Sequence, residues 1–169
     1  MTDKAGPHAR LFVYGTLLDP ALFKIVAGAP MHAFRPGRAR LCGVRAMSAA
    51  NTYQPMLVEG AGTACGLILR DVGGCVWRRL RFFEEPEYFA REVLVMSNGG
   101  ADTLRAVTFW PSKPLKPDIA LWSLARWRRK IGRRALAAAQ AYMALMDRTD
   151  IDLDAAWAEI VERFSLAPI

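Results

Sequence analysis

The sequence predicts an α+β fold: a small mixed, curled β-sheet or barrel with short helices and a C-terminal helical segment. Short apolar runs bounded by turn residues dominate the chain between residues 10 and 110, as expected for strands joined by short turns. Long stretches with a helical pattern begin only near residue 120. The regular alternation of strands with long helices that a doubly wound sheet requires is missing, so we expect strands and helices to be segregated.

The composition fits one globular domain, with 169 residues of which 53% are hydrophobic and 23% charged. Because no apolar run reaches the length of a membrane span and the first residues lack the apolar core of a signal peptide, we expect a cytoplasmic protein without a membrane partner. Cys42, Cys65 and Cys75 are widely spaced, which predicts buried free thiols. With two histidines in the chain, a metal site or a Ser-His or Cys-His catalytic pair is hard to build, so we expect no bound metal.

The first predicted strand, residues 10–14, leads through Gly15 into a short helix. Asp19 and Pro20 suit its N-cap and first position, and Gly28 suits its end. A glycine at such a turn permits a positive φ or a close backbone approach, and successive N–H groups near a helix start attract anions. Alone this pattern is equally that of a plain turn, because no Walker loop or GxGxxG motif accompanies it.

The middle of the chain reads as strands, a helix and a hairpin. We expect strands at 39–47, 55–58, 63–69, 92–96 and 104–110, with turns at 60–62 and 97–102. We expect a helix at 75–83, with Trp77 and Leu80 on one side, and a polar turn at 84–91. A proline-rich surface connection at 111–118 leads to helices at 120–147, interrupted or bent near Gly132, and at 152–165, capped by Asp152.

Glu84 follows the aromatic pair at 82–83 and precedes two further acidic residues, Glu85 and Glu87. Aromatic neighbours desolvate a carboxylate and acidic neighbours repel its charge, so both raise its pKa toward the range useful for proton transfer at neutral pH. Read alone, the segment is better explained as a solvated acidic turn.

The net charge of +7 is concentrated in the segment 126–134, in which tryptophan is interleaved with six cationic residues. One alternative is therefore nucleic-acid binding through phosphate contacts. We favour the other interpretation, in which Trp122, Trp127, Ile131 and Ala135 form a buried stripe and the arginines form a solvated helix face.

Several motifs together resemble the γ-glutamylcyclotransferase-like family, in particular its AIG2-like branch. They are Tyr14-Gly15-Thr16-Leu17 after a strand, the segments from Tyr53 to Leu57 and from Gly66 to Leu69, the segment from Leu80 to Val95, and the late aromatics Trp110, Trp122 and Tyr142. The resemblance implies a loose N-terminus at 1–9, a γ-glutamylcyclotransferase-like domain at 10–148 and a C-terminal helix extension at 149–169.

The resemblance also implies a reaction and a site. Family members release an amine or amino acid from a small γ-glutamyl compound and close the glutamyl part into 5-oxoproline, without a cofactor. Glu84 would be the general acid and base. The backbone N–H groups of Tyr14, Gly15, Thr16 and Leu17 would hold the substrate α-carboxylate, and Tyr88 would either line the pocket or pack in the core.

The sequence departs from the family beside Glu84. Arg81 stands where an Asp is usual, and we expect it to pair with Glu84 and lower its pKa; Glu85 stands where a Gly is usual. These departures keep open a non-catalytic alternative, in which the chain binds a small carboxylate or serves as an interaction domain. The sequence makes no prediction of the oligomeric state.

Overall fold

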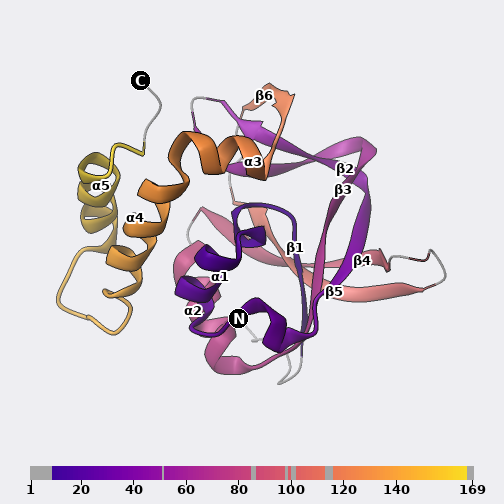
Figure 1. Ribbon diagram of the computed structural model, residues 1–169, viewed down its shortest axis with the longest axis horizontal. Helices are drawn as coiled ribbons and strands as arrows, with labels where there is room; N and C mark the ends of the chain where they lie inside the picture. Colours follow the sequence, from indigo (N-terminus) through magenta and orange to yellow (C-terminus); the bar gives the residue numbers. More distant parts are fainter. Residues whose placement is uncertain are drawn as a thin grey trace.

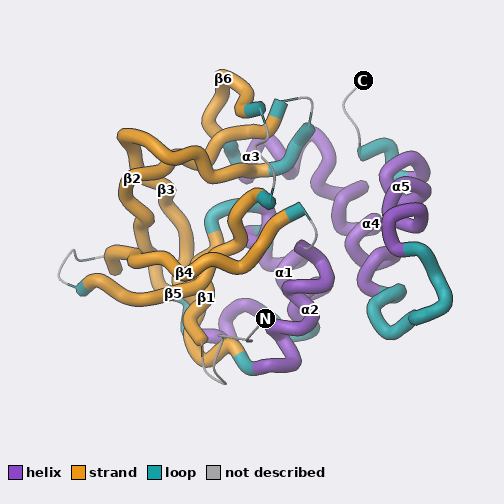
Figure 2. The backbone as a smooth tube through the Cα atoms, turned by 180° about the vertical axis from the view of Figure 1, so that it is seen from behind, coloured by secondary structure: helices purple, strands orange, loops and turns teal. Residues whose placement is uncertain are grey.

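The computed structural model describes residues 9–50, 52–84, 87–97, 99, 102–112 and 116–166. Its strands gather on one side of the molecule and its helices on the other (Figures 1 and 2). The described residues form six strands: β1 (Ala9–Val13), β2 (Gly37–Ala49), β3 (Pro55–Val72), β4 (Tyr88–Ser97), β5 (Thr103–Pro111) and β6 (Pro117–Leu121). They lie in the order β3-β1-β5-β4-β2-β6, and β2 also pairs with β3. Five strands therefore close into a barrel, which confirms the predicted fold class, and β6 adds to the edge of β2.

The helices cover one side of the barrel and continue beyond it. They are two 3₁₀ turns (Thr16–Leu18 and Met31–Phe34), α1 (Pro20–Ala27), α2 (Gly74–Glu84), α3 (Leu124–Trp127), a π-helical turn (Arg128–Gly132), α4 (Arg133–Met143) and α5 (Leu153–Arg163). Helix α1 packs against α2 and α4, and α5 packs on the outer side of α4 (Figure 1). The π-helical turn is the interruption predicted near Gly132.

Strand β1 separates two apolar cores. Leu11 and Val13 pack with the helices, whereas Phe12 and the following Tyr14 point into the barrel. Successive side chains of a strand point to opposite faces, so this short run can serve both cores. The chain then leaves the sheet at Tyr14, between the barrel interior and the helical layer.

Local sequence signals set several helix boundaries as predicted. The Asp19 carboxylate accepts hydrogen bonds from the N–H groups of Ala21 (2.9 Å) and Leu22 (3.0 Å), and α1 ends at Gly28 with φ of 76°. Helix α2 buries Trp77 and Leu80 as expected. At α5, the Asp152 carboxylate caps the first turn in the same way.

Other predictions were wrong where pairing between distant segments decides the structure. Strand β3 runs unbroken through the expected turn at 60–62, because these residues form a bulge opposite Gly43. Residues 120 and 121 belong to β6, which pairs with β2, so the helix begins only after the Ser123 cap. Strand β4 likewise begins inside the expected polar turn, at Tyr88.

The cysteines and the start of the chain differ from what the sequence predicted. All three cysteines are free but exposed, so the expected burial was wrong. Cys42 and Cys65 alternate with the inward-facing Leu41 and Ala64, which places both thiols on the outer face of the barrel. Of the expected loose N-terminus, residues 1–8 lie outside the described residues, whereas Ala9 belongs to β1.

The Asp19 side chain has a second role, which is to connect α1 with the helices near the C-terminus. Arg128, in the π-helical turn, donates from Nε to Asp19 Oδ2 at 2.6 Å, and Asp19 is only 6% exposed. Burial alone raises the pKa of this carboxyl, but the Leu22 N–H and Arg128 outweigh it and hold the pKa below its ordinary value. One carboxylate therefore caps α1 and fastens it to the C-terminal helices.

We predict that Asp19→Ala lowers the free energy of unfolding by roughly 3 kcal/mol, because it removes a cap and leaves Arg128 without its buried partner. Denaturant unfolding followed by circular dichroism measures this loss. The matched control is Asp152→Ala, which removes an exposed cap and should cost about 1 kcal/mol or less. Equal losses in the two variants would contradict the joining role of Asp19.

Candidate active site

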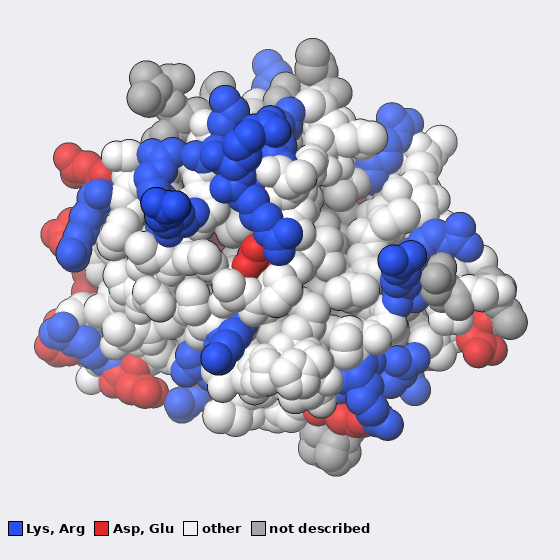
Figure 3. Space-filling view, in the orientation of Figure 1, with Lys and Arg blue, Asp and Glu red and all other residues white. Residues whose placement is uncertain are grey.

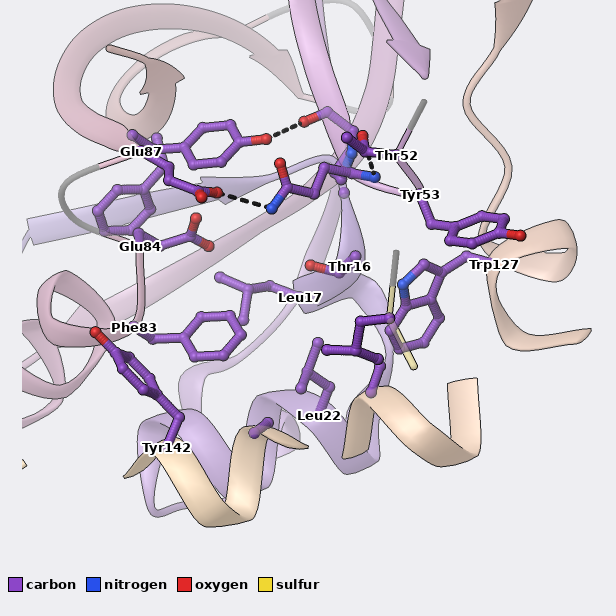
Figure 4. A pocket seen from close by; sticks show the side chains of 18 of the residues that line it. Thr16, Leu17, Leu22, Thr52, Tyr53, Phe83, Glu84, Glu87, Trp127 and Tyr142 are labelled. Carbon is purple, nitrogen blue, oxygen red and sulfur yellow. Dashed lines mark hydrogen bonds between the residues drawn. The ribbon is translucent and has the colours of Figure 1, made fainter. Parts of the chain in front are cut away.

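A cavity of about 410 Å³ lies where the barrel meets the helices. Its walls come from the turn after β1, the segment 52–55 before β3, the end of α2, the start of β4, and helices α4 and α5 (Figure 4). All six residues singled out in the sequence line it: Tyr14, Gly15, Thr16, Leu17, Glu84 and Tyr88. The fold thus brings together segments that lie about seventy residues apart in the chain.

The turn after β1 presents backbone donors to this cavity. The N–H groups of Leu18 and Asp19 donate to the carbonyl oxygens of Gly15 and Thr16, both at 2.9 Å. A 3₁₀ helix leaves the N–H groups of its first residues without a partner inside the helix, and here these are the groups at 15–17. The turn is therefore a ready donor set for an anion.

Gly15 is required for a reason that the sequence did not decide. Its φ is −120°, so the position does not depend on the left-handed region. A Cβ atom at Gly15 would instead collide with the ring of Pro55, which packs directly against the turn. The close approach brings the segment 52–55 over the turn and shapes one side of the cavity.

Glu84 is the last residue of α2, and its side chain points into the cavity (Figure 4). No hydrogen bond or ion pair joins its carboxylate to another residue in the described part of the chain. Burial raises the pKa of Glu84 to about 8, and the Glu87 carboxylate adds to the rise. Glu84 is therefore not part of a solvated turn, and the expected lowering of its pKa by Arg81 is not observed. Glu85 lies outside the described residues.

Two buried tyrosines flank Glu84. The Tyr14 hydroxyl donates to the Phe109 carbonyl at 3.0 Å, and the Tyr88 hydroxyl donates to the Pro55 carbonyl at 2.7 Å. Burial raises the pKa of both phenols, and the charge of Glu84 contributes at each. Tyr88 lines the pocket and is also buried. The two interpretations left open by the sequence, a pocket residue and a core aromatic, therefore both apply.

Several residues that line the pocket were not predicted as site residues from the sequence. Gln54 donates from Nε2 to Glu87 at 2.7 Å, which fixes the second carboxylate beside Glu84 (Figure 4). The remaining wall includes Phe83, Tyr142, Asp154 and Trp157. Their convergence depends on how α4 and α5 pack, which local patterns do not reveal.

The buried stripe expected along the basic segment 126–134 forms in part. Trp127 and Ile131 are buried and Ala135 is partly buried, although Trp122 precedes the helix. Lys and Arg side chains gather over α3 and the turn that follows it (Figure 3), with these members exposed: Arg128, Arg129, Lys130, Arg133 and Arg134. Among the described residues, no cluster of His, Cys, Asp or Glu is arranged to hold a metal, and no helix is long and apolar enough to cross a membrane.

A family model described as Gamma-glutamyl cyclotransferase, AIG2-like, matches residues 11–129. The chain belongs to this family. The match of the AIG2-like domain includes the turn after β1 and Glu84, and it ends inside the π-helical turn. The chain is 29% identical over 123 residues to AIG2-like protein C of Arabidopsis thaliana, covering 70% of this chain and 69% of that protein.

Solved structures share the AIG2-like fold. An Arabidopsis thaliana protein solved in solution superposes with a TM-score of 0.61 at 18% identity, covering 88% of this chain and 99% of the other. A structure titled Gamma-glutamyl cyclotransferase superposes with a TM-score of 0.53 at 12% identity, covering 92% of this chain and 99% of the other. At such identities the likeness establishes the fold.

We predict that Glu84→Gln stabilises this AIG2-like protein, increasingly so as pH rises from 4.5 to 8. In this window the Glu84 carboxyl ionises in the unfolded chain but stays protonated in the fold, so wild type loses stability as pH rises. Glutamine has no proton to lose, so the variant should be more stable by on the order of 2–4 kcal/mol at pH 8 and equal to wild type near pH 4.

Denaturant unfolding at several pH values measures this difference. The control is Glu162→Gln, an exposed charge on α5 that does not line the pocket. A constant offset between Glu84→Gln and wild type at all pH values would show that the Glu84 carboxylate is ionised in the fold.

Proposed function

We propose that this protein is a γ-glutamyl cyclotransferase, which converts a γ-glutamyl compound into 5-oxoproline and a free amine or amino acid. The observation that carries the proposal is the desolvated Glu84 carboxylate, to which the described residues give no hydrogen-bond or ion-pair partner, in one pocket with the backbone N–H groups at 15–17. Family membership supports the reaction class, and the likeness to a structure titled Gamma-glutamyl cyclotransferase supports the use of the fold for it.

The turn would bind the substrate first. The α-carboxylate of the γ-glutamyl group accepts hydrogen bonds from the N–H groups at 14–17, which sets the α-amino group between the turn and Glu84. Holding the flexible glutamyl chain in this folded geometry supplies a large share of the rate, because the attacking nitrogen and its carbonyl belong to one molecule.

Glu84 would then move one proton through the reaction. The uncharged α-amino group gives one proton to the Glu84 carboxylate as its lone pair attacks the γ-carbonyl carbon, so the nitrogen of the new five-membered ring keeps a single hydrogen. A backbone N–H of the turn stabilises the oxyanion. The bond to the leaving nitrogen breaks as Glu84 returns the proton to it, giving 5-oxoproline and the amine. Atoms balance without water or a redox partner.

The environment of Glu84 suits both halves of this cycle. A carboxyl with a pKa of about 8 is basic enough to accept the proton of an amine and acidic enough to return it near neutral pH. The hydroxyl groups of Tyr14 and Tyr88 stay protonated and donate hydrogen bonds to backbone carbonyl oxygens. They therefore shape the site around Glu84 and do not compete for its proton.

We predict that the wild type releases 5-oxoproline from at least one member of a panel of γ-glutamyl amines and amino acids. Glu84→Gln should lower kcat/KM by about 10²- to 10⁴-fold, because the proton carrier is lost while the shape of the pocket is kept. Chromatographic detection of 5-oxoproline measures the rate, with Glu162→Gln as the control for loss of one charge. If wild type and Glu84→Gln are equally inactive across the panel, the non-catalytic, carboxylate-binding alternative takes the place of this proposal.

We also predict that kcat/KM rises with pH through an apparent pKa near 8, as Glu84 becomes the free base. Glu87 raises this pKa by repulsion, so Glu87→Gln should move the rising limb to lower pH by roughly half a pH unit or more. Using one substrate for both proteins holds the ionisation of the substrate constant. A limb that stays in place would assign the titration to another group.

A further inference from the structure

We propose that helices α4 and α5 form the binding site for the leaving group, and that this site takes an amine carrying a second positive charge on a short aliphatic chain. The inference rests on the proposed function, because a leaving group exists only if γ-glutamyl bonds are cleaved. It goes further by naming the chemistry of that group and the residues that select it.

Part of the pocket wall comes from a region of the chain outside the family match. The match ends at residue 129, whereas Tyr142 of α4, Asp154 and Trp157 of α5, and Leu166 line the pocket beyond Glu84. The matched domain and the C-terminal helices thus line different parts of the pocket, here called its glutamyl end and its C-terminal end. Because the turn and Glu84 would hold the glutamyl part of the substrate, the proposal places the leaving group at the C-terminal end.

The C-terminal wall is rich in aromatic rings that pack on one another. Tyr142 stacks on Phe82 with ring centroids 4.8 Å apart and planes at 19°, and Trp157 meets Tyr142 edge-on at 5.1 Å and 64°. Phe83 and Val161 add apolar surface. Such a wall accommodates methylene groups, and the faces of Tyr and Trp rings attract cations.

The charge of the pocket is opposite to that of the whole protein. The chain carries a net charge of +7, yet the charged side chains among the described residues of the lining are Glu84, Glu87 and Asp154, with no lysine, arginine or histidine. The pKa of the Tyr142 phenol is raised by burial first and then by Asp154 and Glu87, so both carboxylates act at this ring. A cation at the C-terminal end is therefore attracted, and a carboxylate there is repelled.

This distribution separates classes of leaving group. The α-carboxylate of the glutamyl part has the backbone donors of the turn, whereas the described residues of the C-terminal wall offer a second carboxylate acidic and apolar neighbours. A diamine presents methylene groups to the rings and a terminal ammonium to Asp154. A simple alkylamine lacks the ammonium, and an amino-acid leaving group brings the wrong charge.

Three γ-glutamyl amides of matched length test the proposal: those of 1,4-diaminobutane, n-pentylamine and 4-aminobutanoate. They end in an ammonium, a methyl and a carboxylate respectively. For wild type we expect kcat/KM for the diamine conjugate to exceed that for the alkylamine conjugate by about tenfold, and that for the acid conjugate by more. A diamine conjugate used no better than the other two would overturn the proposal.

Asp154→Asn identifies the residue responsible. It should reduce the tenfold preference for the diamine conjugate over the n-pentylamine conjugate to about twofold. The matched control is Glu159→Gln, which removes a carboxylate from the same helix at an exposed position outside the pocket lining, and should leave the preference intact. An equal loss for all three conjugates in Asp154→Asn would show a merely structural role.

Binding keeps this test separate from the proposed reaction. Calorimetric titration of the Glu84→Gln variant with the three conjugates reports their affinities without turnover. Tighter binding of the diamine conjugate supports the cation site even if wild type proves inactive, in which case the proposed reaction alone fails. Equal affinities, or tightest binding of the acid conjugate, overturn the cation site whether or not the reaction occurs.

Discussion

The buried carboxylate of Asp19 is the contact on which the arrangement of the candidate site depends. It fixes the start of α1, directly after the turn that presents the backbone donors, and it binds Arg128 of the π-helical turn. The start of the matched domain and the start of the C-terminal helices therefore meet at one side chain. Because charged hydrogen bonds at a buried position are strong and directional, small shifts of either partner are resisted, and the turn at 14–17 stays aligned with the pocket.

A second carboxylate, Glu84, lies in the opposite kind of environment, which raises its pKa where that of Asp19 is lowered. Asp19 has donors that offset its burial, whereas Glu84 has been removed from water with no donor from the described residues and with Glu87 beside it. Such a group lowers stability at neutral pH, and a fold tolerates it when the remaining packing is strong. Here the closed barrel and the helical layer each contribute an apolar core, and the two meet at the pocket. The contrast between the two carboxylates is the main physical reason to assign Glu84 a chemical role.

The pocket is lined partly by residues inside the family match and partly by residues beyond it. The glutamyl end is built from elements inside the family match, which is consistent with a reaction shared across that family. The C-terminal end is built from α4 and α5, beyond the match, and it is there that aromatic rings and Asp154 replace the backbone donors. Under the proposed function, the chemistry would depend on the turn after β1 and the end of α2, and the choice of leaving group on α4 and α5, so selectivity could vary without disturbing the turn or Glu84.

The sequence by itself determined the features that rest on neighbouring residues: the Asp19 cap, the Gly28 end of α1, helix α2 with Trp77 and Leu80 buried, and the Asp152 cap. The order of short motifs was enough to single out Glu84 and the turn at 14–17. Only the tertiary structure decided that Gly15 is required by the ring of Pro55, that β3 continues through the bulge at 60–62, that β6 pairs with β2, and that Asp154 and Trp157 reach the pocket. Caps and helix ends are fixed by bonds within a few residues, whereas barrel closure, close approach and desolvation depend on segments far apart in the chain, whose contacts no local pattern specifies.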